Sequence, residues 1–182
     1  MKCYFFGTFN PIHIGHKKIV DEVKKYLNAP VTVVPSYSPP HKNTLDFSHR
    51  INMARLVFGE DYVSDIEEKI MPPNYSYKTI EKLGECYFII GYDAFLEIES
   101  WKNPKYLKNN LHFIVIPRDF QNKNDKRFDE LRKKGYDFTI LDFNLVNISS
   151  SEIREKIKRG EDTKNLLPKS VESYIYEHNL YK

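Results

Sequence analysis

Cysteine is scarce in this sequence: Cys3 and Cys86 are the only two, and neither stands in a spacing typical of metal ligation. Small secreted domains depend on dense cysteine patterns, so a disulfide framework is not expected. Both residues lie inside short apolar runs. We therefore expect two buried free thiols in a protein of a reducing compartment.

Long apolar runs are also missing. No stretch approaches the roughly 20 apolar residues that a membrane-spanning helix needs. The sequence does not open on a basic segment followed by an apolar one, the pattern of a secretory leader. We expect a cytoplasmic protein without a membrane partner.

Neither sign of charge dominates: 28 Lys and Arg face 25 Asp and Glu, for a net charge of +3. The two signs alternate, as in EKIKRGEDTK, and no basic stripe of the kind that binds nucleic acid is visible. A nucleic-acid partner is not expected. The composition fits a small anionic ligand, and it leaves a homo-oligomer open.

Short apolar runs alternate with helical periodicity along the whole chain. The alternation requires crossover connections, which favour a parallel sheet. We therefore predict an α/β protein: one domain over 1–182 with a Rossmann-like, doubly wound sheet, C-terminal helices and ligands at the carboxyl ends of the strands. The predicted strands are 3–6, 31–34, 61–67, 86–91, 111–117 and 137–143; the predicted helices are 15–27, 49–58, 76–85, 94–98 and 128–133, with two more starting near 150 and 169, and 102–110 is predicted as a loop.

The stretch GTFNPIHIGH, residues 7–16, joins the first strand to the first helix. Gly7 lets backbone amides approach a bulky ligand, and Gly15 leaves room at the start of a helix. The N–H groups and the dipole of that helix favour phosphate. His13 and His16 would then both face the phosphates. The phosphate-loop and dinucleotide-binding glycine patterns are absent, so this turn is a different kind of nucleotide site.

Two separated segments carry a resemblance to a known superfamily. GTFNPIHIGH is similar to the first signature of the nucleotidyltransferases that share an [HT]-x-G-H motif with class I aminoacyl-tRNA synthetases. NISSSEIR, residues 147–154, is similar to their second signature, an ISSTxIR-type segment at a helix start. The pair is far more specific than either segment alone.

Within that superfamily the chain resembles bacterial nicotinate mononucleotide adenylyltransferases. The resemblance departs from the family at Phe6 and Asn10, where the family usually has glycine and commonly aspartate, and at Ser76 and Lys78. The matching segments occur in order over nearly the whole chain: PSYSPPHK, FSHRINMARL, NYSYKTIEKL, FIIGYDAFLEIESWK, HFIVIPR and LLPKSVESYIYEHNLY.

The resemblance implies an activity. The 5′-phosphate of nicotinate mononucleotide would attack the α-phosphate of ATP, releasing pyrophosphate and forming a dinucleotide for NAD biosynthesis. The attacking phosphate is already an anion, so no protein nucleophile and no covalent intermediate are needed. Catalysis would come from alignment and from donors around the triphosphate. Mg²⁺ would enter with ATP, without a metal site of the protein's own.

The resemblance also implies which residues serve each substrate. His16 would contact the α-phosphate in the transition state, His13 would lie beside it, and Arg154 would hold the leaving pyrophosphate; these three are the expected catalytic residues. The expected ATP-binding residues are Gly7, Thr8, Phe9, His13, Gly15, His16, Gly91, Asp93, Ser149, Ser150 and Arg154. The expected mononucleotide-binding residues are His41, Lys42, Ser76, Trp101, Lys102 and Arg118.

Several of these residues have plainer explanations. Ser149 and its neighbours could be an ordinary helix cap before Glu152, and Asp93 could cap a short helix. Trp101 could pack beneath the 102–110 segment rather than stack on a pyridine ring. Arg50 and His49, on a predicted helix, favour solvated or structural roles.

Four other functions remain as alternatives. A phosphopantetheine adenylyltransferase shares both signatures but not the PPHK loop, the SWK segment or the C-terminal match. An enzyme that prefers nicotinamide mononucleotide, or accepts both pyridines, would differ only in contacts to a carboxylate or an amide. A binding module without turnover should lack His16 or Arg154. An RNA-binding fragment of a tRNA synthetase should show a basic stripe and further domains.

Overall fold

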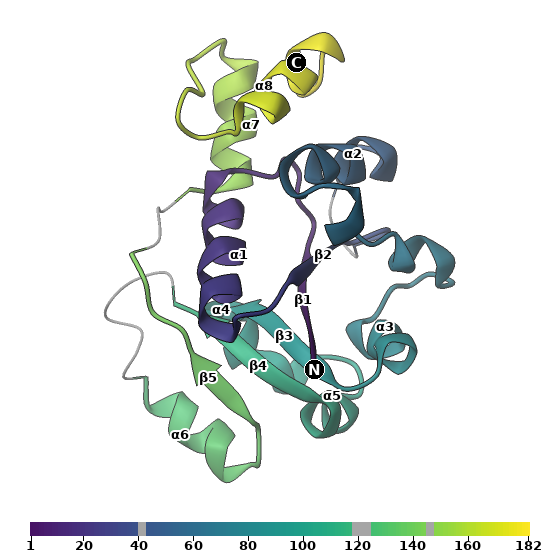
Figure 1. Ribbon diagram of the computed structural model, residues 1–182, viewed down its shortest axis with the longest axis vertical. Helices are drawn as coiled ribbons and strands as arrows, with labels where there is room; N and C mark the ends of the chain where they lie inside the picture. The colour runs from purple at the N-terminus through teal and green to yellow at the C-terminus, as the bar shows by residue number, and fades with distance from the viewer. Residues whose placement is uncertain (40–42, 118–124, 145–147) are drawn as a thin grey trace.

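A computed structural model of the chain describes residues 1–39, 43–117, 125–144 and 148–182. Five parallel strands form one sheet in the order β2-β1-β3-β4-β5 (Figure 1). This confirms the predicted α/β class with a parallel sheet. The strands are β1 (Lys2–Gly7), β2 (Val31–Pro35), β3 (Cys86–Gly91), β4 (Leu111–Ile116) and β5 (Phe138–Ile140).

Helices cover both faces of this sheet, because alternate residues of each strand are apolar on opposite faces. Cys3 and Phe5 of β1 belong to the core on one face, with α1, α2, α7 and α8, whereas Tyr4 belongs to the core on the other, with α3 to α6. The helices are α1 (Ile14–Leu27), α2 (Phe47–Phe58), α3 (Ser76–Leu83), α4 (Tyr92–Leu96), α5 (Pro104–Asn110), α6 (Lys126–Lys133), α7 (Ser150–Lys158) and α8 (Lys169–Glu177).

The predicted strand over 61–67 is wrong. The segment forms two 3₁₀ turns, Glu60–Tyr62 and Ile66–Lys69, and only Val63 makes an isolated bridge to Val33 at the edge of the sheet. The 102–110 segment, predicted as a loop, contains α5. Asn103 caps that helix, because its side chain accepts a hydrogen bond from the N–H of Tyr106, and Pro104 occupies the first turn.

Both cysteines are free and buried, as predicted. They lie on neighbouring strands but belong to the cores on opposite faces of the sheet. Burial raises the pKa of each thiol to about 12, so both stay protonated at neutral pH. Within the described residues, no helix is both long and apolar enough to span a membrane.

The strand order places a switch point between β1 and β3. The chain leaves β1 toward β2 on one side, and the later strands β3, β4 and β5 are added on the other. In open parallel sheets such a reversal opens a crevice at the carboxyl ends of the two central strands. Here those ends are Gly7 and Gly91.

Candidate active site

Two adjoining cavities open at this switch point. The first has a volume of about 620 Å³ and the second about 550 Å³, both within the range of small-molecule sites. Phe5, Thr8 and Gly91 line both cavities, so the two are contiguous at the ends of β1 and β3. A Cβ added to Gly91 would meet no atom within 4 Å, and its backbone therefore stays open to a ligand.

The turn after β1 is shaped by Phe9. This residue adopts a φ of 48°, which only a minority of non-glycine residues show, and its ring is buried. A Cβ on Gly7 would come within 2.7 Å of the Phe9 ring. Gly7 is therefore needed for the close packing of Phe9 over the strand end, whereas the sequence argument assigned it to ligand approach.

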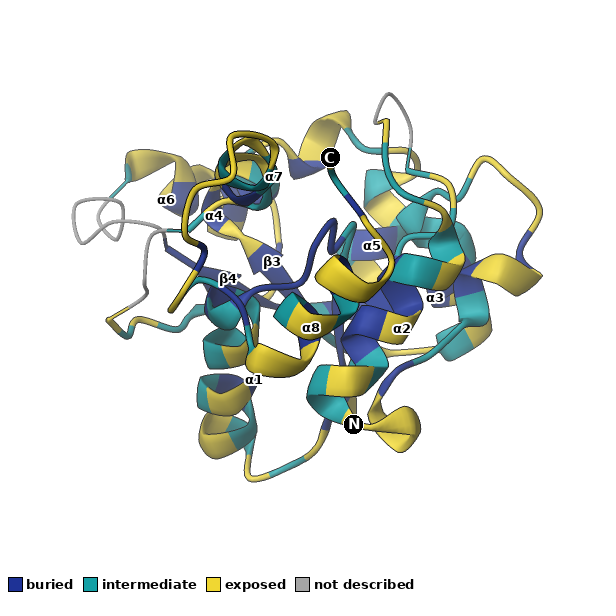
Figure 2. Ribbon diagram, turned by 90° about the horizontal axis from the view of Figure 1, so that it is seen from above, coloured by how far each residue is buried: buried dark blue, intermediate teal, exposed yellow. Residues whose placement is uncertain are grey.

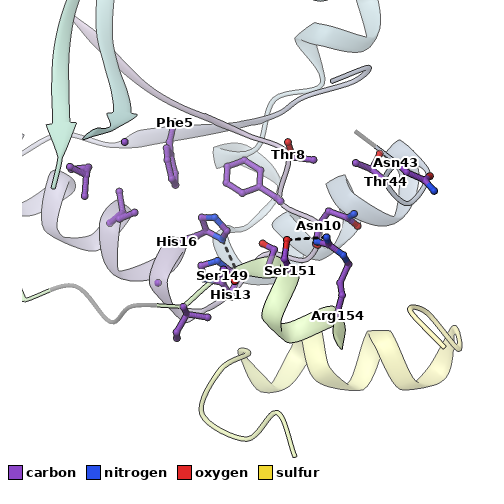
Figure 3. A pocket seen from close by; sticks show the side chains of 17 residues that line it. Phe5, Thr8, Asn10, His13, His16, Asn43, Thr44, Ser149, Ser151 and Arg154 are labelled. Atoms are coloured by element: carbon purple, nitrogen blue, oxygen red, sulfur yellow. Dashed lines mark hydrogen bonds between the residues drawn. The ribbon is translucent and has the colours of Figure 1, made fainter. Parts of the chain in front are cut away.

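His13 and His16 stack on each other at the start of α1, with ring centroids 3.6 Å apart (Figure 3). The backbone N–H of His13 donates to Nδ1 of His16 over 3.2 Å. This bond places the proton of a neutral His16 on Nε2, leaving an N–H donor at the other side of the ring. Nδ1 of His13 is buried without a hydrogen-bond partner among the described residues. Both histidines line the first cavity.

Burial keeps both histidines neutral in the free protein. It lowers the pKa of His13 to about 4. Burial, and then the neighbouring His13, hold the pKa of His16 well below its usual range. A bound polyphosphate would act in the opposite direction, because nearby negative charge favours the imidazolium.

The histidine pair should make the protein lose stability in mild acid. A histidine whose folded pKa lies below its unfolded value stabilises the fold fully above pH 6.5, and this contribution is lost as the pH falls through 6.5 toward the folded value. For His13, with a folded pKa of about 4, the loss approaches about 3 kcal/mol. Between pH 7.5 and pH 4.5, the urea midpoint of unfolding should fall less for His13→Gln than for the wild type. An equal fall in both proteins would contradict this assignment.

The second signature docks directly on the first. Arg154 of α7 donates to the carbonyl of Asn10 over 2.8 Å and to Oγ of Ser151 over 3.1 Å. Ser150 Oγ donates to the carbonyl of Pro11 over 2.9 Å. Figure 3 shows Arg154, Ser149 and Ser151 facing the histidine turn from α7. Residues 140 positions apart thus line one cavity.

Ser149 is the N-cap of α7, since its Oγ accepts from the N–H of Glu152 over 3.1 Å. The plainer explanation of this serine, a helix cap, therefore holds. The N–H groups of Ser150 and Ser151, in the first turn, have no acceptor inside the helix. Together with the helix dipole they suit phosphate oxygens at the cavity.

The second cavity has aromatic walls. Trp101 is half-buried and meets Phe88 edge-on, with ring centroids 6.3 Å apart. Ser76, the first residue of α3, also lines the cavity, as do Tyr75 and Lys102. Lys102 and Lys78 each lie just under 6 Å from the centre of the Tyr75 ring. A flat apolar ring with a negative substituent would suit this space.

Phe6 lies in this second cavity, although a glycine was expected there by resemblance. Its ring stacks on that of Phe88, 4.8 Å away and 13° from parallel. Since strand residues alternate between faces, Phe6 points away from the turn that Phe5 and Phe9 border. It therefore does not crowd the turn after β1 and instead forms part of the aromatic wall.

The structure describes only some of the remaining predicted site residues. His41, Lys42 and Arg118 lie outside the described residues. Asp93 lies in the first turn of α4, exposed, and is not among the residues that line either cavity. The helix cap there is Gly91, not Asp93. Thr8, Phe9 and Gly15 do line the first cavity.

Sequence reasoning missed how Arg50 is used. Its side chain is 1% exposed and donates to four backbone carbonyls. Two of them, Thr8 and Ser36, border the cavities, so Arg50 joins the turn after β1 to the loop after β2. The acceptors are the carbonyls of Leu45, Thr8, Ser36 and Tyr37, at 2.9, 3.0, 2.6 and 3.1 Å. Sequence patterns indicate a structural arginine here but not its acceptors.

The described residues that line the first cavity include no carboxylate. Among the described residues, no group of three or more His, Cys, Asp and Glu could hold a metal ion. The polar groups that line the first cavity are hydroxyls, amides, imidazoles and a guanidinium. Such a lining fits a Mg²⁺ carried by phosphate oxygens and water, the usual manner in which Mg²⁺ reaches nucleotide sites.

Comparison with known proteins places these features in a family. The cytidylyltransferase-like family profile matches residues 4–156. A Clostridium tetani protein named "Probable nicotinate-nucleotide adenylyltransferase" is 35% identical, covering 100% of this chain and 98% of its own. A protein of the same name from Fusobacterium nucleatum is 38% identical, covering 93% of each chain.

Solved structures agree in fold. The nicotinic acid mononucleotide adenylyltransferase of Plasmodium falciparum, complexed with NaAD, superposes with a TM-score of 0.80 at 24% identity, covering 100% of this chain and 98% of that one. The same enzyme complexed with APC superposes with a TM-score of 0.75 at 25% identity, covering 98% of this chain and 96% of that one. The chain therefore belongs to the cytidylyltransferase-like nucleotidyltransferases and, within them, to the nicotinate-nucleotide adenylyltransferase family.

Proposed function

We propose that the protein transfers the adenylyl group of ATP to nicotinate mononucleotide, forming nicotinate adenine dinucleotide and pyrophosphate in NAD biosynthesis. The observation that carries the proposal is the pair of contiguous cavities at the switch point. One is bordered by both signatures, and the other has an aromatic wall with Lys102 in its lining. Two buried free thiols suit a reducing compartment, and we place the reaction in the cytoplasm.

The first cavity would take the triphosphate. An oxygen of the mononucleotide phosphate forms a bond to the α-phosphorus while the bond from that phosphorus to the bridging oxygen breaks, and pyrophosphate leaves with the electron pair. Nε2–H of His16 would donate to an α-phosphate oxygen, and the guanidinium of Arg154, held on the Asn10 carbonyl, would offer its charge to the leaving pyrophosphate. Mg²⁺ bound with ATP would neutralise part of the triphosphate charge. The residues themselves would align the two substrates and stabilise the negative charge that develops at the α-phosphorus.

The second cavity would take the pyridine nucleotide. The start of α3 at Ser76 and the ammonium group of Lys102, both of which line the cavity, favour a negatively charged ring substituent. This supports nicotinate over nicotinamide, whose neutral amide gains less from positive charge. His41, Lys42 and Arg118 stay predicted contacts to the mononucleotide phosphate.

The test is pyrophosphate release from ATP and Mg²⁺, run in parallel with nicotinate mononucleotide, nicotinamide mononucleotide and 4′-phosphopantetheine. We expect release with the nicotinate substrate to exceed the other two by at least tenfold. Equal rates with both pyridine nucleotides would make the enzyme dual-specific. Release with none of the three would overturn the proposal and favour a binding module.

Replacing Trp101 with alanine should raise the KM for the mononucleotide by about tenfold and the KM for ATP by less than twofold. The indole lines only the second cavity, so its loss removes ring contact without touching the triphosphate site. Steady-state kinetics with each substrate varied in turn measure the split. Tyr106→Ala removes a half-buried aromatic that packs on the same core but lines neither cavity, and serves as the control. Equal effects on both KM values would identify Trp101 as a structural residue.

A further inference from the structure

The C-terminal end of the chain reaches into the phosphate-binding turn. Tyr181, the penultimate residue, donates its hydroxyl to Oδ1 of Asn10 over 2.7 Å. Asn10 is 5% exposed and lines the first cavity. Figure 2 looks onto the side of the molecule where α7, α8 and the C-terminus gather. The contact spans 171 positions of sequence.

The geometry of this tail is set by the end of α8. The N–H of Leu180 bonds the carbonyl of Ile175, and that of Asn179 bonds the carbonyl of Tyr176. Asn179 has a φ of 51°, so the helix closes in a Schellman motif with asparagine in the left-handed position. Leu180 is buried in the core shared by α1 and α2. The tail is therefore anchored, and Tyr181 is held toward Asn10.

Asn10 in turn holds the residues that border the cavity. Its backbone carbonyl accepts from Arg154, and its Oδ1 also accepts from the N–H of Leu45 over 3.4 Å. The carbonyl of Leu45 is bonded by the buried Arg50. Asn10 thus connects three parts of the site: the turn after β1, the loop before α2 and the guanidinium of α7. A shift of Asn10 would move Arg154 with it.

We propose that Tyr181 is a positioning residue for adenylyl transfer: its hydroxyl fixes Asn10 and, through the Asn10 carbonyl, the guanidinium of Arg154. Tyr181 does not line either cavity and so acts through Asn10, without touching substrate. The proposal rests on the proposed function, because it assigns a role within that reaction. Rate depends steeply on the placement of reacting groups, so a small loosening here should show in kcat.

The hydroxyl of Tyr181 is suited to act as a constant hydrogen-bond donor. Burial raises the pKa of Tyr181 far above the physiological range, and Arg154 and Arg50 lie near enough to oppose part of that rise. The phenol therefore stays protonated near neutral pH, and its hydrogen bond to Asn10 is present there.

The first experiment compares Tyr181→Phe with Tyr176→Phe. Tyr181→Phe removes one oxygen and keeps the packed ring, so we expect an unchanged thermal midpoint, a kcat about tenfold lower, an ATP dissociation constant about threefold weaker and an unchanged KM for the mononucleotide. Tyr176 is 62% exposed on α8, and its variant should match the wild type. A Tyr181→Phe protein with kcat within twofold of the wild type would overturn the proposal.

The second experiment is a double-mutant cycle with Asn10. In an Asn10→Ala background Tyr181→Phe should cost nothing further, because the acceptor is gone; in an Asn10→Asp background, which keeps an acceptor oxygen, the cost should persist. Equal costs in all backgrounds would overturn the proposal. The same cycle can be calculated from ATP dissociation constants measured by calorimetry, so it does not require turnover. Absence of pyrophosphate release from the wild type would count against the proposed function alone.

Discussion

Replacing His16 with alanine should lower kcat by about 10²–10³-fold, the usual cost of removing one preorganised donor to a developing charge. The tautomer is fixed by the bond from the His13 N–H to Nδ1, so Nε2–H is the group that alanine removes. Because the donor acts mainly on the transition state, the ATP dissociation constant should change by less than about threefold. Single-turnover rates and calorimetry separate the two effects.

The control for His16 is His112→Ala. His112 lies near the start of β4, bonded to Asp137 and Thr139, and lines neither cavity. Its variant should keep wild-type kcat. If His16→Ala also kept it, the imidazole would have no part in the chemistry, and the backbone and Arg154 would carry the charge stabilisation.

Replacing Arg154 with alanine should lower kcat/KM for ATP by about 10³-fold. The guanidinium has two roles in the proposed reaction. It holds the α7 helix to the turn after β1 through the Asn10 carbonyl, and it would offer a positive charge to the leaving pyrophosphate. Arg154→Lys keeps a charge but not the planar fork, so it should recover less than a tenth of the lost activity. Initial rates at varied ATP give the comparison.

Arg159→Ala is the matched control for Arg154. Arg159 caps the end of the same helix but is exposed, and it pairs with Glu161 over 3.7 Å. Exposed pairs of this kind contribute little, so the variant should behave as the wild type. A full recovery of activity by Arg154→Lys would show that charge alone matters and that the fork does not.

Much of the fold follows from the sequence because strands such as Cys86–Gly91 are buried on both faces and read as continuous apolar runs. The prediction for segment 61–67 failed because its short apolar cluster, Tyr62, Val63 and Ile66, resembles part of a strand, whereas only Val63 pairs with the sheet edge. The short helix at 104–110 was missed because its seven residues carry only one buried side chain, Leu107, which gives no periodicity to detect.

The candidate site was less predictable than its motifs. Both signatures could be recognised, yet their contacts, such as Arg154 to the Asn10 carbonyl, depend on chain crossings that no local pattern records. From the sequence, Phe6 could be recognised only as a departure from the family's usual glycine. The structure shows that its ring points toward Phe88, away from the turn after β1. Tyr181 and Arg50 were not predicted to act on the turn, because a side chain that bonds a distant carbonyl or amide leaves no signature of its own.

The tie between the penultimate residue and the tenth has a consequence for biosynthesis. Contacts between distant positions form late, because closing a long loop costs entropy before it returns any stability. During translation the first signature and the sheet edge can fold early, but Asn10 can obtain its tyrosine partner only after Tyr181, 171 positions later, has been synthesised. The nascent chain would thus complete its nucleotide site only after Tyr181 has emerged from the ribosome.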